Sequence, residues 1–327
     1  MLQKQLEIEI RAFFDFAADM VFRKGMMMKK LWLTLLLVMA FFTAVNAETD
    51  AGKYIKAAVP LNSGYDIPLF GISCTGLSSE KTENLVYAGL KAGFRLIEIG
   101  GSPAGEEGAG RGLQKAIGEG FVNREDIFLS VPFTAGTEED GDTYIQGMLE
   151  RLKLEYVDLM MLQQSDYAKD MESWQAMERA SEDGKIRSLG LSGFFFVQNY
   201  DLFVNNAASV QPAVLKIPVH PYEQRQDMRD HLAGSGTVLV SDSPLGGKGE
   251  EQVLFADPVI SLEATWYKKT SSQVILRWQL QSGNIIMPQV SDEAQIEEYY
   301  QVLEFELSDD DMTKIGSLDR SLNFVIY

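Results

Sequence analysis

The chain has 327 residues, and its 29 Lys and Arg against 47 Asp and Glu give a formal net charge of −18 at pH 7. A chain this acidic is not expected to bind nucleic acid or anionic lipid. We expect the negative charge to keep the protein soluble, unless a basic partner binds to it. Hydrophobic residues make up 46% of the chain, enough for a sizeable core, and the one cysteine, Cys74, excludes an internal disulfide.

Residues 1–47 have the pattern of a leader and a secretory signal. Lys29 and Lys30 precede an uncharged apolar run at 31–45, and Val45-Asn46-Ala47 offers the small residues that a signal peptidase reads. We expect cleavage after Ala47 and a mature chain in the secretory pathway or outside the cytoplasm. The apolar run is short for a bilayer span, so membrane attachment is expected only if the segment stays uncleaved. The polar and aromatic composition of residues 1–25 is typical of a sequence whose start codon has been assigned too far upstream.

From residue 58 onward, short apolar strands alternate with amphipathic stretches, which is typical of repeated βα units around a parallel sheet. The strand candidates are Leu69–Ser73, Phe94–Ile99, Ile127–Val131, Tyr156–Leu162, Ser188–Leu191, Ala213–Ile217, Val238–Ser241 and Asn284–Pro288. The predicted helices between them are Thr82–Lys91, Asp142–Leu152, Met171–Ser181 and Ser272–Gln281. Eight such strands can close, so residues 48–327 are predicted to form an α/β fold, a (β/α)8 TIM barrel.

Two further elements are predicted at the ends of this region. Lys56–Pro60 and Tyr65–Pro68 flank Asn62-Ser63-Gly64, a pattern that favours an N-terminal β-hairpin. Ser308, with Asp311 three positions later, is typical of the first residues of a final helix.

The chain resembles the aldo-keto reductase family from Leu61 to about Asp319. The motifs that carry the resemblance are Ala92-Gly93-Phe94-Arg95, Tyr156-Val157-Asp158-Leu159, Gly184-Lys185-Ile186-Arg187, His220-Pro221-Tyr222, Ser243-Pro244-Leu245-Gly246 and Gln273-Val274-Ile275-Leu276-Arg277-Trp278. The resemblance implies a single barrel with the hairpin across its bottom and the site at the C-terminal ends of the strands. We expect His220-Pro221-Tyr222 and Arg277-Trp278 to hold loops and helices rather than to perform chemistry.

The family moves a hydride from a nicotinamide to a carbonyl while a tyrosine, tuned by a lysine and an aspartate, donates the proton and a histidine orients the carbonyl. The aspartate, tyrosine, lysine and histidine positions fall, in this order, at Glu98, Pro103, Pro132 and Gln163. No tyrosine lies between Tyr87 and Tyr144 and no lysine between Lys115 and Lys153, so a shifted alignment does not restore the set. The resemblance therefore implies that no catalytic position is intact.

The cofactor contacts that the resemblance implies are also depleted. Those retained are Ser192, Ser243, Leu245 and Glu298, and those replaced are at Gly193, Lys216, Asp242, Gln289 and Gln295. Two family cations become Gln289 and Gln295, a loss that weakens the binding of a polyanionic dinucleotide in an acidic protein. We therefore expect no NADP(H) binding or only weak binding, and no metal site.

Three functional hypotheses follow. The first is a pseudoenzyme that acts by binding or scaffolding, with a protein or small molecule as its partner. The second is a diverged NADP(H)-dependent oxidoreductase that reduces carbonyl substrates, with Glu98 as the acid and Gln163 as a hydrogen-bond donor to the carbonyl. The third is a binder of a small ligand or sugar at the barrel mouth. Cofactor affinity separates the second from the other two, and we prefer the first.

Overall fold

The computed structural model describes residues 54–135, 140–247 and 251–320. The expected leader and signal peptide at residues 1–47 lie outside the described residues. Within the described part of the chain, no helix is both long enough and apolar enough to cross a membrane.

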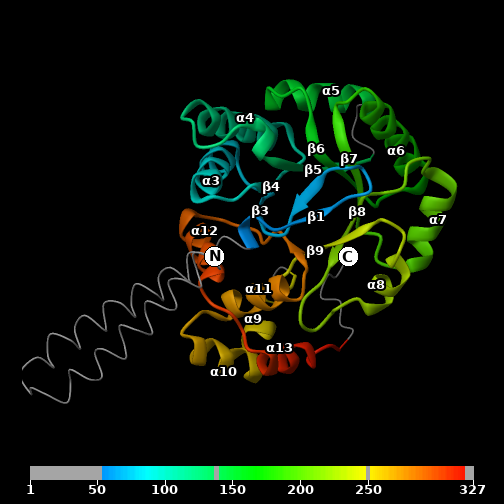
Figure 1. Ribbon diagram of the computed structural model, residues 1–327. Coiled ribbons are helices and arrows are strands. Elements are labelled where there is room, and N and C mark those ends of the chain that lie inside the picture. Colours follow the sequence, from blue (N-terminus) through cyan, green and yellow to red (C-terminus); the bar gives the residue numbers. More distant parts are fainter. Residues whose placement is uncertain (1–53, 136–139, 248–250, 321–327) are drawn as a thin grey trace, which may run out of the picture. The chain divides into compact units, whose positions relative to one another are not determined.

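Eight parallel strands form one sheet, in which each strand pairs with the strands before and after it in the chain (Figure 1). They are β3 (Gly71–Cys74), β4 (Leu96–Ile99), β5 (Phe128–Thr134), β6 (Val157–Gln163), β7 (Ile186–Ser192), β8 (Val214–Pro218), β9 (Val238–Asp242) and β10 (Ile285–Ile286). The last strand returns to the first, because Ser73 N donates to Pro288 O at 2.9 Å and Val290 N donates to Ser73 O at 3.0 Å. The predicted (β/α)8 barrel is confirmed.

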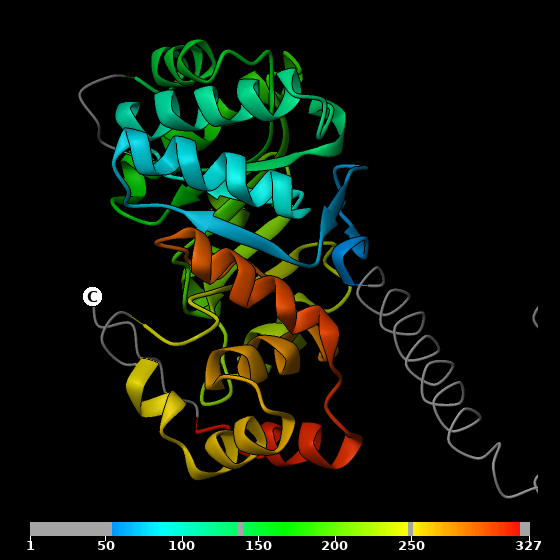
Figure 2. The ribbon, with the colours of Figure 1, turned by 90° about the vertical axis from the view of Figure 1, so that its left-hand side faces the viewer.

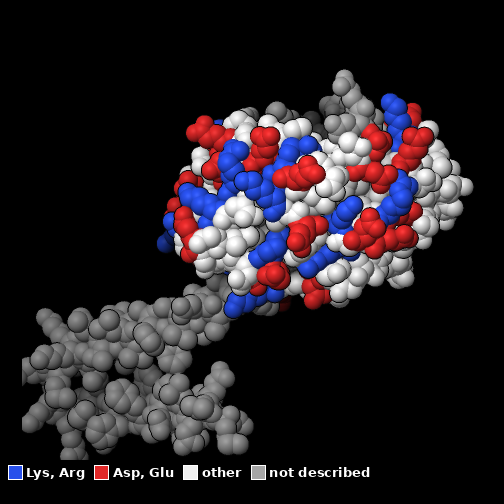
Figure 3. Space-filling model, turned by 90° about the horizontal axis from the view of Figure 1, so that it is seen from above, with Lys and Arg blue, Asp and Glu red and all other residues white. Residues whose placement is uncertain are grey.

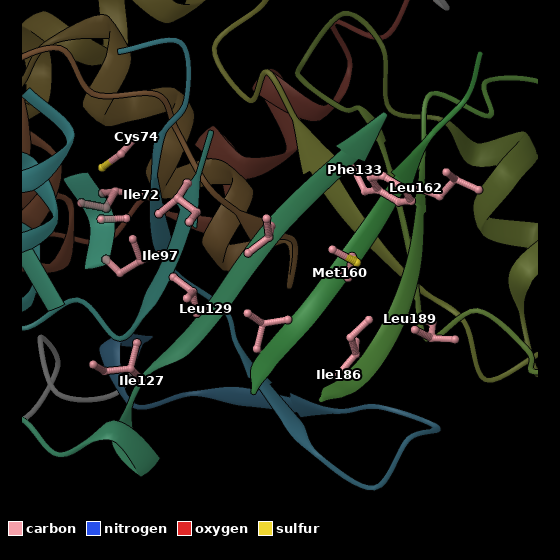
Figure 4. Close-up of a cluster of buried hydrophobic side chains, with 14 of the residues drawn as sticks. Ile72, Cys74, Ile97, Ile127, Leu129, Phe133, Met160, Leu162, Ile186 and Leu189 are labelled. Atoms are coloured by element: carbon pink, nitrogen blue, oxygen red, sulfur yellow. The ribbon is translucent and has the colours of Figure 1, made fainter. Parts of the chain in front are cut away.

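The strands bury both of their faces. Side chains such as Ile72, Ile97, Leu129 and Met160 point outward into the layer beneath the helices (Figure 4). The alternate residues point into the lumen. Among them, Leu96, Phe128, Leu159, Met161 and Val214 belong to a second hydrophobic cluster. Because both faces are buried, each strand is an almost continuous apolar run, which is why the sequence located all eight.

The predicted hairpin closes the N-terminal end of the barrel. Strands β1 (Ala58–Pro60) and β2 (Asp66–Pro68) pair antiparallel, and Leu61 and Ile67 pack into the lumen cluster. Figure 2 shows the hairpin at the end of the barrel from which β3 departs. The opposite end, where the strands finish, is left for a site.

The helices that pack on the barrel confirm all four predicted ones and add others. Their bounds are α3 (Ser79–Ala92), α4 (Pro103–Gly118), α5 (Gly141–Leu152), α6 (Tyr167–Glu182), α7 (Val197–Ala207), α8 (Gln226–Leu232), α9 (Glu251–Phe255), α10 (Pro258–Tyr267), α11 (Ser271–Gln281), α12 (Glu293–Tyr300) and α13 (Asp309–Gly316), with 3₁₀ turns at Arg124–Asp126 and Gln301–Glu304. The expected start of the final helix is confirmed, because Ser308 Oγ accepts a hydrogen bond from Asp311 N at 3.2 Å.

Helix α4 escaped prediction because its glycines resemble a loop. Its N-cap is Ser102, whose hydroxyl accepts a hydrogen bond from Gly105 N, and Pro103 occupies the first turn, where its missing N–H costs nothing. The glycines allow close packing on both neighbours. A Cβ at Gly108 would lie 2.1 Å from Ser79 O at the start of α3, and one at Gly110 would lie 2.7 Å from Arg151 O of α5.

Charged side chains on the outer helices are paired rather than segregated. Arg111 binds Glu83, Arg151 binds Glu106 and Arg179 binds Asp142, so that α3, α4, α5 and α6 are joined in sequence. The face that is uppermost in Figure 1 accordingly shows acidic and basic side chains side by side (Figure 3).

Candidate functional site

Glu98 occupies the barrel mouth near the C-terminal end of β4. Its side chain is inside the barrel, with only 1% of the residue exposed. Ser73, its register partner on β3, donates a hydrogen bond from Oγ to Glu98 Oε1 at 3.0 Å. Burial of a carboxylate at this position requires a positively charged partner.

That partner is Lys216 on β8. Its Nζ donates to both Glu98 oxygens at 2.8 Å and lies 3.2 Å from Asp242 Oδ1 at the end of β9. Because β4 and β8 are four strands apart in either direction around the eight-stranded barrel, the ammonium must cross the lumen to reach Glu98. The three charged groups therefore form one bridge across the mouth.

The bridge keeps Lys216 charged. Burial lowers the pKa of Lys216, but the carboxylates of Asp242 and Glu98 raise it more, and the net pKa lies above its usual value. Asp242 is the outermost member, with 38% of its side chain exposed. Lys216, which the resemblance implied to be a replaced cofactor contact, is thus the partner of Glu98, and Asp242 is in turn a partner of Lys216.

Pro103 and Pro132 stand at the positions where the resemblance implied the tyrosine and the lysine. Pro103 is the first residue of α4. Pro132 lies in β5 beyond Ser130, the last residue of β5 that pairs with β4, so its missing N–H breaks no ladder bond on that side. The backbone at Gly101 packs closely against Pro132, because a Cβ added at Gly101 would lie 2.3 Å from Pro132 O. Neither side chain can donate or accept a proton.

The side chain of Gln163 lies close to the backbone of Gly193. Gln163 ends β6, and Gly193 follows Ser192, the last residue of β7. Gly193 has a φ of +83°, and a Cβ there would lie 2.5 Å from Gln163 Nε2. A side chain at position 193 would therefore be strained at this φ and would have to displace the flexible end of Gln163. This proximity could not be recognised from either position alone.

One hydroxyl group in the lumen has no hydrogen-bond partner among the described residues. Ser130 is the register neighbour of Glu98 on β5 and is fully buried, yet its Oγ has no hydrogen-bond partner within the residues that the structure describes. A polar atom in this state is one that a small bound molecule or a water could satisfy.

A cavity of about 460 Å³ lies beside the mouth, between the segments that follow β9 and β10. Two of the expected cofactor residues, Ser243 and Leu245, line it, and Ser243 has a φ of +51°, which turns the chain sharply after β9. Ser192 lies instead next to Gln163 in the β6–β7 register. Glu298 faces α11, where its Oε1 accepts hydrogen bonds from Thr270 Oγ1 and Ser272 Oγ at 2.6 Å each.

The described lining of the cavity carries no cationic side chain. None of the described residues that line it is a lysine or an arginine, while Glu251 contributes a carboxylate. Gln289 donates from Nε2 to Thr75 O at 2.9 Å, and Gln295 Oε1 accepts from Ser291 N at 2.7 Å, so both amides hold the surrounding loops. Burial, with a smaller contribution from the carboxylates of Glu298, Asp292 and Glu251, raises the pKa of Tyr299 in the cavity wall to about 12.

The remaining motifs hold the fold, as the sequence suggested. His220 and Glu223 exchange backbone hydrogen bonds at 3.0 and 2.9 Å. Tyr222 donates to Asp257, and Trp278 Nε1 donates to Met312 O at 3.2 Å. Among the residues described, no cluster of three or more histidine, cysteine or acidic side chains is suited to a metal ion.

Comparison with known proteins agrees with the fold and the motif order. A family model described as Aldo/keto reductase family matches residues 69–320. The glyoxal reductase of Bacillus subtilis (strain 168) is 33% identical over 272 residues, which cover 81% of this chain and 94% of that protein. An aldo-keto reductase of Mycobacterium sp. (strain MCS) is 31% identical over 277 residues, covering 82% and 92%.

Two solved structures have the same fold. The aldo/keto reductase from Brucella melitensis superposes with a TM-score of 0.70 at 29% identity, covering 80% of this chain and 99% of that one. The Bombyx mori aldo-keto reductase, solved in complex with NADP, gives a TM-score of 0.71 at 24% identity, covering 83% and 95%.

Proposed function

Because the chain belongs to the Aldo/keto reductase family, we propose that it uses the family's barrel to bind or scaffold and not to reduce carbonyl compounds. The observation that carries the proposal is the bridge in the lumen, where both oxygens of Glu98 accept hydrogen bonds from Lys216. Glu98, the position that aligns with the family's catalytic aspartate, therefore already has a hydrogen-bonding partner inside the protein.

The bridge leaves the mouth without a proton donor of the family's kind. Carbonyl reduction needs a group that gives a proton to the carbonyl oxygen from within hydrogen-bond reach. A carboxylate that accepts hydrogen bonds on both oxygens has no proton to give, which argues against Glu98 as a replacement acid. The proline side chains at 103 and 132 offer nothing in its place.

The bridge also resists rearrangement. Leaving a buried charge without its partner costs about 3–5 kcal/mol, more than one ordinary hydrogen bond to a ligand returns. Lys216 therefore stays on Glu98 when a ligand arrives. A ligand at the mouth instead meets Asp242, the exposed end of the bridge, which favours a polar molecule.

Weak binding of NADP(H) belongs to the same proposal. Gln289 and Gln295 carry no charge and already hold loops, and Glu251 repels phosphate. Titration of the purified chain with NADPH and with NADH, followed by fluorescence quenching, tests this expectation. Micromolar or tighter affinity, on the order of −8 kcal/mol, would contradict it. The Bombyx mori aldo-keto reductase, solved in complex with NADP, is the positive control.

A second candidate is a diverged oxidoreductase, and the cavity of about 460 Å³ that retains Ser243 and Leu245 favours it. Relatives of comparable length carry reductase names, among them the glyoxal reductase. Turnover of methylglyoxal with NADPH, in the same preparation used for the titration, decides between the candidates. Turnover clearly above the uncatalysed rate would establish the second candidate and overturn the first.

A further inference from the structure

A second cavity, of about 300 Å³, lies at the other end of the barrel from the mouth. Its wall combines the hairpin turn at Asn62 and Ser63 with the start of β7 at Arg187 and Ser188, and the segment before β8 completes it. Three elements far apart in the sequence thus meet around one hollow, and the mouth described above has no part in it.

Arg187 gives this cavity a positive charge. Its Nη1 donates to Asp158 Oδ1 at 3.0 Å, but the other oxygen of Asp158 already accepts from Arg124 Nη2 at 2.7 Å and from Leu129 N at 3.0 Å. Two guanidinium groups therefore share one carboxylate, which leaves one positive charge in excess. The described lining contains no carboxylate to cancel it.

The Arg187 guanidinium is also held in a fixed orientation. Its Cζ lies 3.7 Å from the ring centroid of Tyr156 and 5.0 Å from that of Tyr65. Within the described part of the chain, only Nη1 makes a hydrogen bond, so the edge formed by Nε and Nη2 remains available. A planar fork with one free edge is the arrangement that binds a carboxylate or phosphate through two parallel hydrogen bonds.

Hydroxyl groups complete the wall. Ser63 Oγ and Ser188 Oγ are 2.8 Å apart, and Ser188 is 1% exposed, so the floor of the hollow is polar and buried. Asn62 Nδ2 donates to Pro212 O at 3.2 Å, which fixes the hairpin turn over the segment before β8. The hollow is thus built from several interlocked groups and does not depend on one exposed side chain.

We propose that this cavity binds a small molecule with a carboxylate or phosphate group, held by the free edge of Arg187 and by the serine hydroxyls. At roughly 30 Å³ per water, a hollow of this size holds about ten waters, which suits a small metabolite and excludes a dinucleotide. The ligand binds here whether or not the mouth is occupied.

The test is calorimetric titration of the full chain with inorganic phosphate and, separately, with malonate, with ionic strength held constant by NaCl. Ser63→Asp places a negative charge at the cavity while keeping an acceptor for Ser188, and Ser63 lies in an exposed turn, so the fold tolerates it. Arg187→Gln removes the fork. Gln114→Glu, on the exposed side of α4, adds the same charge far away and serves as the control.

We expect saturable binding of at least one probe, weakened tenfold or more by Ser63→Asp and by Arg187→Gln and less than twofold by Gln114→Glu. The tighter probe identifies the group, phosphate or carboxylate. If neither probe saturates, or if Ser63→Asp binds like the unmodified chain, the proposal is overturned. Should Arg187→Gln fail to fold, Ser63→Asp decides alone.

Discussion

Lys216 is the residue on which the barrel mouth depends most. Replacing it with methionine leaves Glu98 buried without a positive partner, and we expect the free energy of unfolding to fall by about 3–5 kcal/mol. Urea denaturation followed by circular dichroism measures the loss. In the double variant Lys216→Met with Glu98→Gln no charge is stranded, so much of the stability should return. A single variant as stable as the unmodified chain would show that the bridge does not form.

His220 predicts a particular dependence of stability on pH. Burial lowers its pKa from 6.5 to about 4, an effect that Asp319 only partly opposes. The unfolded chain therefore takes up a proton at a pH where the folded chain does not, and stability falls as the pH drops from 6.5 to about 4. The slope from this group is about 1.4 kcal/mol per pH unit.

Unfolding midpoints measured between pH 7 and pH 4 test this dependence. His220→Gln is expected to flatten the acid limb of the curve relative to the unmodified chain. His231→Gln, which replaces the other histidine of the chain, controls for the general effect of such a substitution. Equal slopes in the two variants would show that His220 is not the group responsible.

Restoring the family's proton-transfer residues alone is expected to leave the chain inactive. The four changes are Glu98→Asp, Pro103→Tyr, Pro132→Lys and Gln163→His. Lys216 would still compete for the carboxylate at 98, and the nicotinamide would still lack its ring and amide contacts. Aldehyde turnover with NADPH compares this variant with a second one that also carries Lys216→Gln, Asp242→Tyr, Gly193→Asn, Gln289→Lys and Gln295→Arg.

The second variant should be clearly the more active. It adds the ring, amide and cationic side chains for the cofactor that the first variant lacks. Substantial activity in the first variant would mean that the cofactor site is intact, and the oxidoreductase candidate would then take precedence.

At the scale of elements, the contact between α3 and α4 depends on glycine. Gly108→Ala places a Cβ 2.1 Å from Ser79 O, and we expect the two helices to separate at a cost of about 1–3 kcal/mol. Gly118→Ala, at the open end of the same helix, meets nothing within 4 Å and should be neutral or stabilising by up to about 1 kcal/mol. Thermal unfolding of the pair isolates packing from helix propensity, and equal effects would refute the packing explanation.

The strands were predictable and the contacts between them were not. A barrel strand is buried on both faces, so its apolar run is visible in any short window of sequence. Glu98 and Lys216 are 118 residues apart on strands that do not pair, and no local pattern connects them. The sequence thus placed Glu98 and Lys216 on predicted strands, whereas their pairing appeared only when the barrel closed. Helix α4 was missed for the opposite reason, since its glycines serve a neighbour and not the helix itself.

At the scale of the whole molecule, we propose that the chain is exported. The motivation is the sequence Lys29-Lys30, the apolar run at 31–45 and Val45-Asn46-Ala47. A full chain tagged at its C-terminus should lose its first 47 residues, and N-terminal sequencing of the product measures this. The control carries Leu36→Arg in the apolar run and should remain unprocessed. An intact chain in the cytosol would contradict the proposal.

The contact between the first and last barrel strands, β3 and β10, is called the seam here, and it limits how early during synthesis the chain can complete its fold. Ser73 bonds to Pro288 and Val290, and Gln289 bonds to Thr75 over a separation of 214 residues. A ribosome must therefore release nearly the whole polypeptide before the seam can form, and contacts of such long range form slowly. Until then the edge strands β3 and β10 lack each other as partners, and the barrel cannot close.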